Sequence, residues 1–151
     1  MSTRCQIAFY EADEKDLNKF ESLIYRHCDG YPKGVLPDIT PFLNWFLKVR
    51  GWDPEYIAAR LLQYLCDNSD KNSERVYAEM RMENPEKGFT GLTGHGICRG
   101  FHSDIEYFYA IYPDKIKVFE TDFDFGEENK DINDRVKRIK TVKIGKEQDN
   151  G

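Results

Sequence analysis

The spacing of apolar residues changes twice along this chain. From about residue 35 to residue 67 apolar residues recur every three to four positions, whereas the segments before and after alternate between apolar and polar residues. A spacing of three to four marks one face of a helix, and a spacing of two marks one face of a strand. The sequence therefore predicts helices in the middle of an α+β fold, with strands drawn from both ends of the chain.

Two helices are predicted in the central stretch. The first runs from Val35 or Pro37 to Arg50 and stops before Gly51, with Pro41 acceptable only near its first turn. Asp53 and Pro54 predict the start of the second, as N-cap and first helical residue, and this helix ends by Asn68. The short connection between them predicts a helical hairpin, which needs an apolar surface to pack on.

Strands are predicted on both sides of these helices. Residues 4–11 and 23–27 form an antiparallel pair joined by a charged connection. Residues 105–112 and 116–121 form a hairpin across Pro113-Asp114-Lys115. We therefore expect an antiparallel sheet with the helical hairpin packed on one face.

Two further segments are predicted less sharply. Residues 73–83 fit either a helix or a strand, and Val142 and Ile144 could belong to a last edge strand.

Length and charge limit the class of protein. With 151 residues the chain predicts one domain, 1–151, and a net charge of −5 argues against polynucleotide binding, which favours a basic surface. Its apolar runs are too short to cross a bilayer, which takes about 20 residues, so we expect no membrane partner. The first six residues have no apolar signal region, which predicts a cytoplasmic protein.

The cysteines predict free thiols, because their spacing matches no zinc or redox motif. They are Cys5, Cys28, Cys66 and Cys98. His27, Cys28, His95 and Cys98 would make a soft zinc set, but adjacent residues on a strand point to opposite faces. We therefore expect no metal and no cofactor.

The C-terminal part divides by charge. Residues 120–134 contain seven acidic residues and one basic residue, whereas residues 135–146 contain six basic residues and none that is acidic. The two segments are either solvated surfaces that attract one another, or the basic one is an arm that contacts an anionic partner.

Residues 24–35, with the sequence Ile-Tyr-Arg-His-Cys-Asp-Gly-Tyr-Pro-Lys-Gly-Val, are the most distinctive segment. They predict a strand followed by a tight turn that displays His27, Asp29 and Tyr31 around Gly30. His27 and Asp29 could transfer a proton or only stabilise the turn. Arg26 has the donor geometry for a phosphate, and Tyr31 could stack on a base.

This segment resembles a family of small, mostly uncharacterised proteins of bacteriophages, archaeal viruses and their hosts. In that family a start similar to residues 2–8 precedes a Tyr-x-His-x-Asp-Gly-Tyr-Pro-x-Gly-Val signature, and a strand similar to residues 105–109 follows. Position 28 is often Trp in the family and is Cys here. The resemblance implies a phage or prophage setting, where small acidic proteins often antagonise host defence.

Residues 88–102 are a second candidate, with five glycines in the first thirteen positions. Their backbone N–H groups could turn toward an anion, and His95 and Arg99 add side-chain donors. The segment lacks the Gly-Lys-Ser or Gly-Lys-Thr of a phosphate-binding P-loop. It could equally be a flexible connection.

Three functions follow as hypotheses. The first is a non-catalytic protein, acting in counter-defence, that sequesters a small phosphate-bearing ligand, for example a nucleotide immune signal. Its site combines the turn and the glycine-rich loop: Arg26, His27, Asp29, Tyr31, His95 and Arg99. The second is a metal-independent phosphodiesterase or hydrolase that uses His27 and His95 as acid and base. The third is a protein-interaction module that docks through the acidic segment 120–134. In each case a homo-oligomer is expected, because the edge of the 105–121 hairpin suits symmetric pairing.

Overall fold

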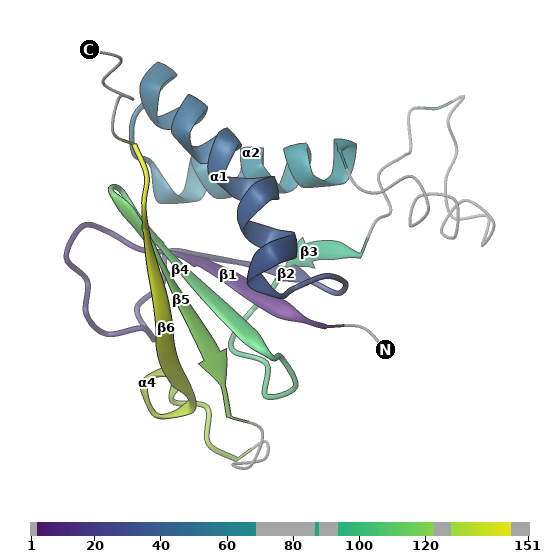
Figure 1. The fold of residues 1–151 in the computed structure, drawn as a ribbon, viewed down its shortest axis with the longest axis vertical. Helices are drawn as coiled ribbons and strands as arrows, with labels where there is room; N and C mark the ends of the chain where they lie inside the picture. The colour runs from purple at the N-terminus through teal and green to yellow at the C-terminus, as the bar shows by residue number, and fades with distance from the viewer. Residues whose placement is uncertain (1–2, 69–86, 88–93, 123–127, 146–151) are drawn as a thin grey trace.

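The protein is built on a six-stranded sheet in the order β3-β2-β1-β4-β5-β6 (Figure 1). The computed structural model describes residues 3–68, 87, 94–122 and 128–145. The strands are β1 (Cys5–Phe9), β2 (Ser22–Arg26), β3 (His95–Ile97), β4 (Tyr107–Tyr112), β5 (Lys115–Thr121) and β6 (Val136–Lys143). The helices are α1 (Pro32–Val49), α2 (Pro54–Asp67) and the single turn α4 (Ile132–Arg135).

The sheet is mixed, so the prediction of an antiparallel sheet is wrong at one position. The predicted antiparallel pair β1–β2 and the hairpin β4–β5 are both confirmed. However, β1 and β4 run parallel, with Ile7 opposite Tyr109. A parallel neighbour requires a long crossover. Here both helices and β3 lie between β2 and β4 in the sequence, which allows β4 to enter beside β1.

The second helix is as predicted, but the first begins earlier. In α2 the Asp53 carboxylate accepts a hydrogen bond from the backbone N–H of Tyr56 at 3.2 Å, which is an N-cap. Helix α1 begins at Pro32, so Pro37 and Pro41 both lie inside it. An internal proline removes a backbone hydrogen bond. The buried face of α1 offsets that loss, because five large apolar side chains of this helix pack into the core: Val35, Ile39, Phe42, Leu43 and Phe46.

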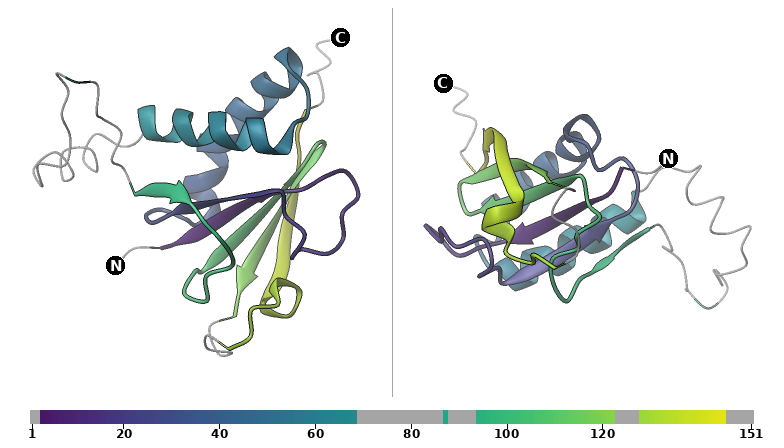
Figure 2. Two further views of the ribbon diagram at one scale, coloured as in Figure 1. Left: turned by 180° about the vertical axis from the view of Figure 1, so that it is seen from behind. Right: turned by 90° about the horizontal axis from the view of Figure 1, so that it is seen from below.

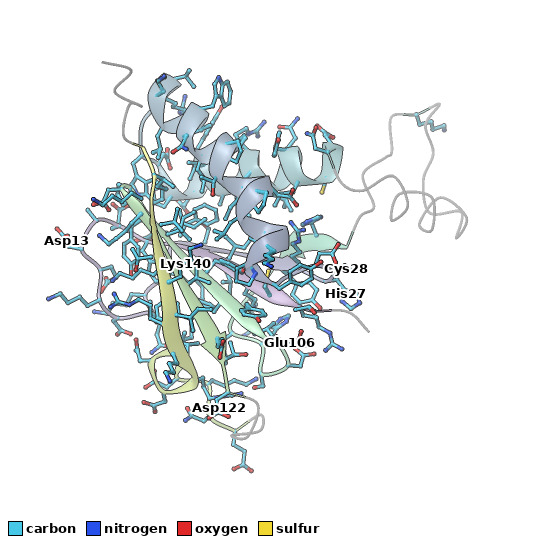
Figure 3. The ribbon with its side chains drawn as sticks, viewed as in Figure 1. Asp13, His27, Cys28, Glu106, Asp122 and Lys140 are labelled. Atoms are coloured by element: carbon cyan, nitrogen blue, oxygen red, sulfur yellow. The ribbon has the colours of Figure 1, made fainter. Side chains whose placement is uncertain are left out.

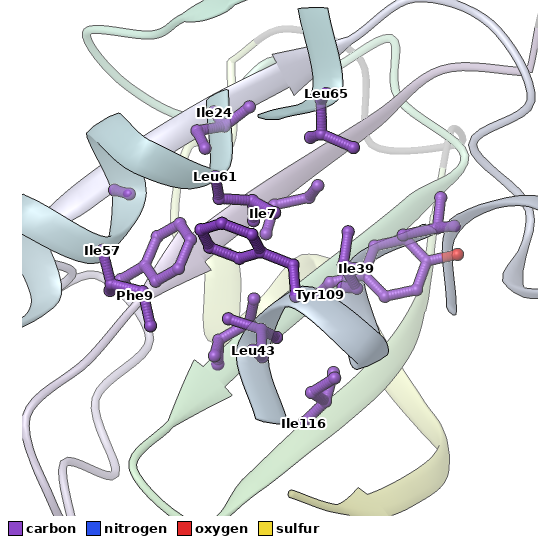
Figure 4. Close-up of a cluster of buried hydrophobic side chains, with 14 of the residues drawn as sticks. Ile7, Phe9, Ile24, Ile39, Leu43, Ile57, Leu61, Leu65, Tyr109 and Ile116 are labelled. Atoms are coloured by element: carbon purple, nitrogen blue, oxygen red, sulfur yellow. The ribbon is translucent and has the colours of Figure 1, made fainter. Parts of the chain in front are cut away.

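The first core joins α1 and α2 to side chains of β1, β2, β4 and β5 (Figure 4). Ile7, Phe9 and Ile24 of the sheet lie in one cluster with Ile57 and Leu61 of α2. These side chains are essentially excluded from solvent. Burial of each is worth roughly 1.5 to 3 kcal/mol, so this cluster is a principal source of stability.

The other face of the sheet forms a second core, which includes Ala8, Phe108 and Tyr112. Connecting segments cover it, as the views in Figure 2 show. Gln6 holds one of them in place, since its fully buried amide donates to the carbonyl of Gly100 and accepts from the backbone N–H of His102, both at 3.0 Å.

Two Asp-x-Asn triplets hold two of these connections together by reciprocal hydrogen bonds. The Asn18 amide donates to Asp131 at 2.8 Å, and the Asn133 amide donates to Asp16 at 2.9 Å. Each asparagine Oδ1 accepts, at 3.0 Å, from the backbone N–H of the middle residue of the other triplet. Those middle residues are buried in the second core. Part of the acidic segment is therefore committed to the fold.

Arg135 joins another pair of connections. It is almost completely buried, and its guanidinium donates to the carbonyl of Asp122 at 2.6 Å and to that of Asn129 at 2.8 Å. It also lies 5.4 Å from the centre of the Phe101 ring. Backbone carbonyls thus satisfy the buried guanidinium, as its burial requires.

Strand β6 is longer than the predicted pair of edge residues and includes most of the basic segment. It pairs with β5, and β4 pairs with β1, so both edges of the hairpin are already occupied. The hairpin edge therefore gives no basis for the expected homo-oligomer. The ambiguous residues 73–83 lie outside the described residues. In the part of the chain that the structure describes, no helix is long and apolar enough to cross a membrane.

Candidate functional site

The turn of the signature segment packs closely against the first strand. Asp29 has a left-handed backbone (φ +56°), which aspartate tolerates better than most residues. A Cβ at Gly30 would lie 2.8 Å from the carbonyl oxygen of Thr3, so only glycine fits there. The Gly30 carbonyl also accepts a hydrogen bond from the buried Tyr109 hydroxyl at 2.7 Å. Asp29 and Gly30 thus serve the turn itself, which is one of the two roles considered for Asp29.

The next residues of the signature begin helix α1. Pro32 occupies the first helical turn, where its missing N–H has no cost. A Cβ at Gly34 would lie 2.5 Å from the carbonyl oxygen of Asp29, so the helix start packs directly on the turn. The Asp-Gly-Tyr-Pro-x-Gly pattern therefore acts as a joint between β2 and α1.

Arg26 points into the protein. Its side chain is 8% exposed, and it forms an ion pair with Asp38 of α1 at 2.8 Å. Its Nε also donates to the carbonyl of Cys28 at 2.9 Å. The charge of Arg26 is thus neutralised at the joint between β2 and α1, which opposes its predicted role as a phosphate donor.

His95 lies opposite Arg26 in the β2–β3 ladder, so two of the predicted site residues do come together. Burial of the imidazole and, secondarily, the nearby Arg26 charge lower the pKa of His95 from 6.5 to about 4. The imidazole is therefore neutral at pH 7 and contributes no positive charge for an anion.

Arg99 lies away from this group. The ladder places His95 opposite Arg26 and continues to the Cys98 N–H, which donates to the Leu23 carbonyl. Arg99 lies beyond the end of β3, in a bend of the chain, and it is exposed. The expectation that Arg26 and Arg99 face a common cavity is therefore wrong. The sequence could not reveal this, because it does not give the register of the strands. Residues 88–93 of the same segment lie outside the described residues.

His27 lies on the other face of the sheet from His95. It follows Arg26 directly, and its Nδ1 is hydrogen-bonded to the Tyr25 hydroxyl at 2.8 Å (Figure 3 shows His27 beside the turn). Alternate residues of a strand lie on the same face of the sheet, so His27 shares a face with Tyr25. His95, which is paired with Arg26, lies on the opposite face. The two imidazoles cannot act on one substrate as acid and base, which is a correction to the hydrolase hypothesis.

Tyr31 borders a hollow that is unfavourable for an anion. The hollow has a volume of about 520 Å³ and is also lined by Glu106 and Glu120. The Tyr31 hydroxyl itself donates to the Asp29 carboxylate at 3.2 Å, and this bond raises the pKa of Tyr31. Acidic groups thus surround the side of the turn that was expected to receive a phosphate.

A cleft between α1 and α2 is lined by aromatic rings and two arginines, in contrast to the acidic hollow at Tyr31. Its volume is about 360 Å³. Aromatic rings line much of it: Phe42, Trp45, Phe46, Tyr56 and Tyr64. The Phe42 and Tyr64 ring centres are 5.1 Å apart, and Trp45 is 57% exposed although Phe42 and Phe46 beside it are buried. An exposed ring at the border of a buried aromatic group offers a stacking surface to a planar ligand.

Two arginines lie at this cleft. The guanidinium carbon of Arg50 is 3.8 Å from the centre of the Tyr56 ring, and that of Arg60 is 5.3 Å from the same centre. The Arg60 Nη1 donates to the Gln63 side chain at 2.9 Å. Among the described residues, neither guanidinium forms an ion pair with a carboxylate. Their positive charge therefore remains available to an anion at the cleft.

Sequence reasoning missed this cleft. The helical spacing of the first predicted helix places Phe42 or Leu43, Phe46 and Val49 on its apolar face, which leaves Trp45 off that face. A tryptophan off the apolar stripe was the available signal. The other tryptophan, Trp52, packs against Phe9 with ring centres 6.4 Å apart.

No family model, curated protein or solved structure matches this chain. The four cysteines form no disulfide with one another, as predicted. Within the described ranges, no group of three or more His, Cys, Asp or Glu side chains is arranged to hold a metal ion.

Proposed function

We propose that the protein is a non-catalytic binding protein for a small ligand that carries both an aromatic ring and a phosphate, and that the α1–α2 cleft receives this ligand. The observation that carries the proposal is the pair of guanidinium groups, Arg50 and Arg60, stacked on Tyr56 beside the exposed ring of Trp45. A nucleotide has the two required parts, a planar base and an anion.

The rings and the charges have separate tasks in this arrangement. Trp45 and Tyr64 lie on the cleft and provide flat surfaces for a base, where stacking is worth roughly 1 to 3 kcal/mol per base. Arg50 and Arg60 provide planar donor groups for phosphate oxygens, with charge-assisted hydrogen bonds of about 1.5 to 3 kcal/mol each. Contact with the Tyr56 ring restrains both guanidinium groups before the ligand arrives, which reduces the entropic cost of binding.

Sequestration suits the chemistry of this cleft. Its side chains are aromatic rings, one valine, two arginines, amides and one carboxylate, Asp67. None of them is a cysteine, serine or histidine that could attack a phosphate or exchange a proton near neutral pH. In the phage or prophage setting implied by the resemblance, such a protein would hold a nucleotide immune signal and withdraw it from the host.

Fluorescence and thermal shift test the proposal. A panel of linear and cyclic nucleotides is added to the Trp52→Phe variant, in which Trp45 is the only tryptophan. We expect quenching of Trp45 and a rise in Tm with at least one nucleotide, and recovery of that nucleotide intact after heat release.

Matched variants locate the site. Arg50→Gln with Arg60→Gln should weaken binding at least tenfold, whereas Lys48→Gln, an exposed charge on α1 outside the cleft, should leave it unchanged. The proposal fails if no nucleotide shifts the Tm, or if the two arginines and Lys48 have equal effects. A chemically altered nucleotide would show catalysis instead.

A further inference from the structure

A second charged surface lies at the far end of the sheet, on β5 and β6. Lys117 is opposite Ala110 and Lys115 is opposite Tyr112, and both partners belong to the second core. Residues paired across a ladder share a face. The two lysines therefore lie on the face of the sheet away from α1 and α2.

The register of β6 adds two more cations to this face. Lys143 is opposite Lys115, and Arg138 is opposite Phe119, which is also part of the second core. A bulge at this point leaves Ile139 as an extra residue between the pairs. We call Lys115, Lys117, Arg138 and Lys143 the β5–β6 cationic face.

The cations of this face are close together and partly held. The ammonium groups of Lys117 and Lys115 lie 4.9 and 5.2 Å from the centre of the Tyr112 ring. Partial burial and the charges of Lys115, Arg138 and Lys15 lower the pKa of Lys117. Asp114, which forms an ion pair with Lys115 at 3.2 Å, acts on Lys117 in the opposite direction. Among the described residues, most of the charges that act on Lys117 are therefore positive.

This arrangement has a cost that the fold itself does not require. Like charges directly opposite one another across a ladder are destabilising, and Lys115 and Lys143 are such a pair. One lysine would be enough to protect an edge strand from pairing. Positions that break a local rule without a structural gain are expected at functional surfaces.

We propose that the β5–β6 cationic face binds the phosphate backbone of a nucleic acid without reading its sequence. The cations follow two neighbouring strands, and alternate residues of a strand are about 6.6 Å apart, so the face presents a row of charges rather than a pocket. Tyr112 is buried, so within the described residues this face offers no exposed ring for stacking on bases. Phosphates are thus the groups that it can contact.

The net charge of −5 does not oppose this binding. At physiological ionic strength charges are screened beyond about 8 Å, so a phosphate at this face responds to the local cations and not to the acidic segments elsewhere. The proposal therefore departs from the expectation, drawn from composition, that no polynucleotide would bind. The proposal is independent of the α1–α2 cleft.

The salt dependence of binding to a 20-base-pair DNA duplex tests the proposal. If four cations contact phosphates, the logarithm of the binding constant should fall with the logarithm of salt concentration with a slope of about −3.6. Lys117→Gln with Arg138→Gln should reduce the magnitude of that slope by about 1.8 and weaken binding more than tenfold in 50 mM salt.

Lys140→Gln is the matched control, because Lys140 lies on β6 opposite Val118 and so faces the helix side (Figure 3). It should leave the slope unchanged, as should Arg50→Gln with Arg60→Gln. If the Lys117→Gln, Arg138→Gln variant does not fold, the variant Lys115→Gln with Lys143→Gln takes its place, with the same expected reduction in slope and in binding. The proposal is overturned if DNA does not bind in 25 mM salt, if Lys140→Gln acts as strongly as the face variants, or if the protein binds anionic vesicles but not DNA.

Discussion

Replacement of His95 should remove a defined part of the pH dependence of stability. Its side chain is partly buried beside Arg26, and its pKa in the folded protein is about 4 against 6.5 in the unfolded chain. Between these two values the unfolded chain binds a proton that the folded protein does not. Unfolding therefore takes up a proton in this window, and the free energy of unfolding falls as the pH falls.

The size of the effect follows from the two pKa values. Each unit of difference corresponds to 1.36 kcal/mol, so His95 should account for about 3 kcal/mol between pH 6.5 and pH 4. The loss should be steepest near the middle of the window, at up to about 1.4 kcal/mol per pH unit. Ordinary carboxylates begin to take up protons below about pH 5, so the effect of His95 is isolated by comparing the protein with its His95 variant at each pH.

Urea unfolding at half-unit steps from pH 4 to pH 7.5 provides the measurement. We expect the unmodified protein to lose about 3 kcal/mol on acidification and His95→Gln to lose much less, with His102→Gln as a control that removes an imidazole elsewhere. An unchanged pH profile in His95→Gln would refute the assignment of the buried neutral imidazole. A His95 pKa near 6.5 in a histidine NMR titration would do the same.

Three substitutions test the contacts that hold the turns and connections. Gly30→Ala should lower the free energy of unfolding by more than about 2 kcal/mol, because its Cβ would meet the Thr3 carbonyl at 2.8 Å, whereas Gly100→Ala, with open space around it, should cost less than about 1 kcal/mol. Asn133→Ala should cost about 1 kcal/mol in urea unfolding and raise the pKa of Asp16 in a carboxyl NMR titration, since the Asn133 amide is the main cause of its low value. An Asn133→Asp variant also lacks the amide donor. If its Asp16 pKa and its free energy of unfolding equalled those of the unmodified protein, that reasoning would be contradicted. Arg135→Met should lower the free energy of unfolding by about 2 to 4 kcal/mol, because buried carbonyls lose their donor. Backbone amides near Asp122 should then exchange hydrogen faster. Full retention of stability would show that water replaces the guanidinium as donor.

Local patterns were enough for elements whose signals lie within a few residues. Asp53 and Pro54 start α2 as predicted, because an N-cap and a first-turn proline act on the backbone next to them. The hairpin of β4 and β5 is also as predicted, since its alternating residues flank a short turn. The start of α1 was predicted too late, because the packing of its apolar face outweighs two internal prolines.

The candidate site depended on information that no local pattern contains. Arg26 and Arg99 both have phosphate-binding chemistry. The pairing of β2 with β3 leaves Arg26 in an ion pair with Asp38 and Arg99 on the surface. The cleft at Trp45 exists only because α2 lies against α1. Likewise, the β5–β6 cationic face requires β6 to pair with β5 in one register.

By itself, therefore, the sequence determined the types of β1, β2, β4, β5, α1 and α2, the cap of α2 and the turn at Gly30, because each depends on the conformations that neighbouring residues allow; β3 and most of β6 were not predicted. The tertiary structure decided the parallel pairing of β1 with β4 and the partner of every charged side chain. The physical reason is that distant strands pair in the arrangement that buries the apolar faces of the sheet and the helices. The free energy of that burial depends on contacts along the entire chain.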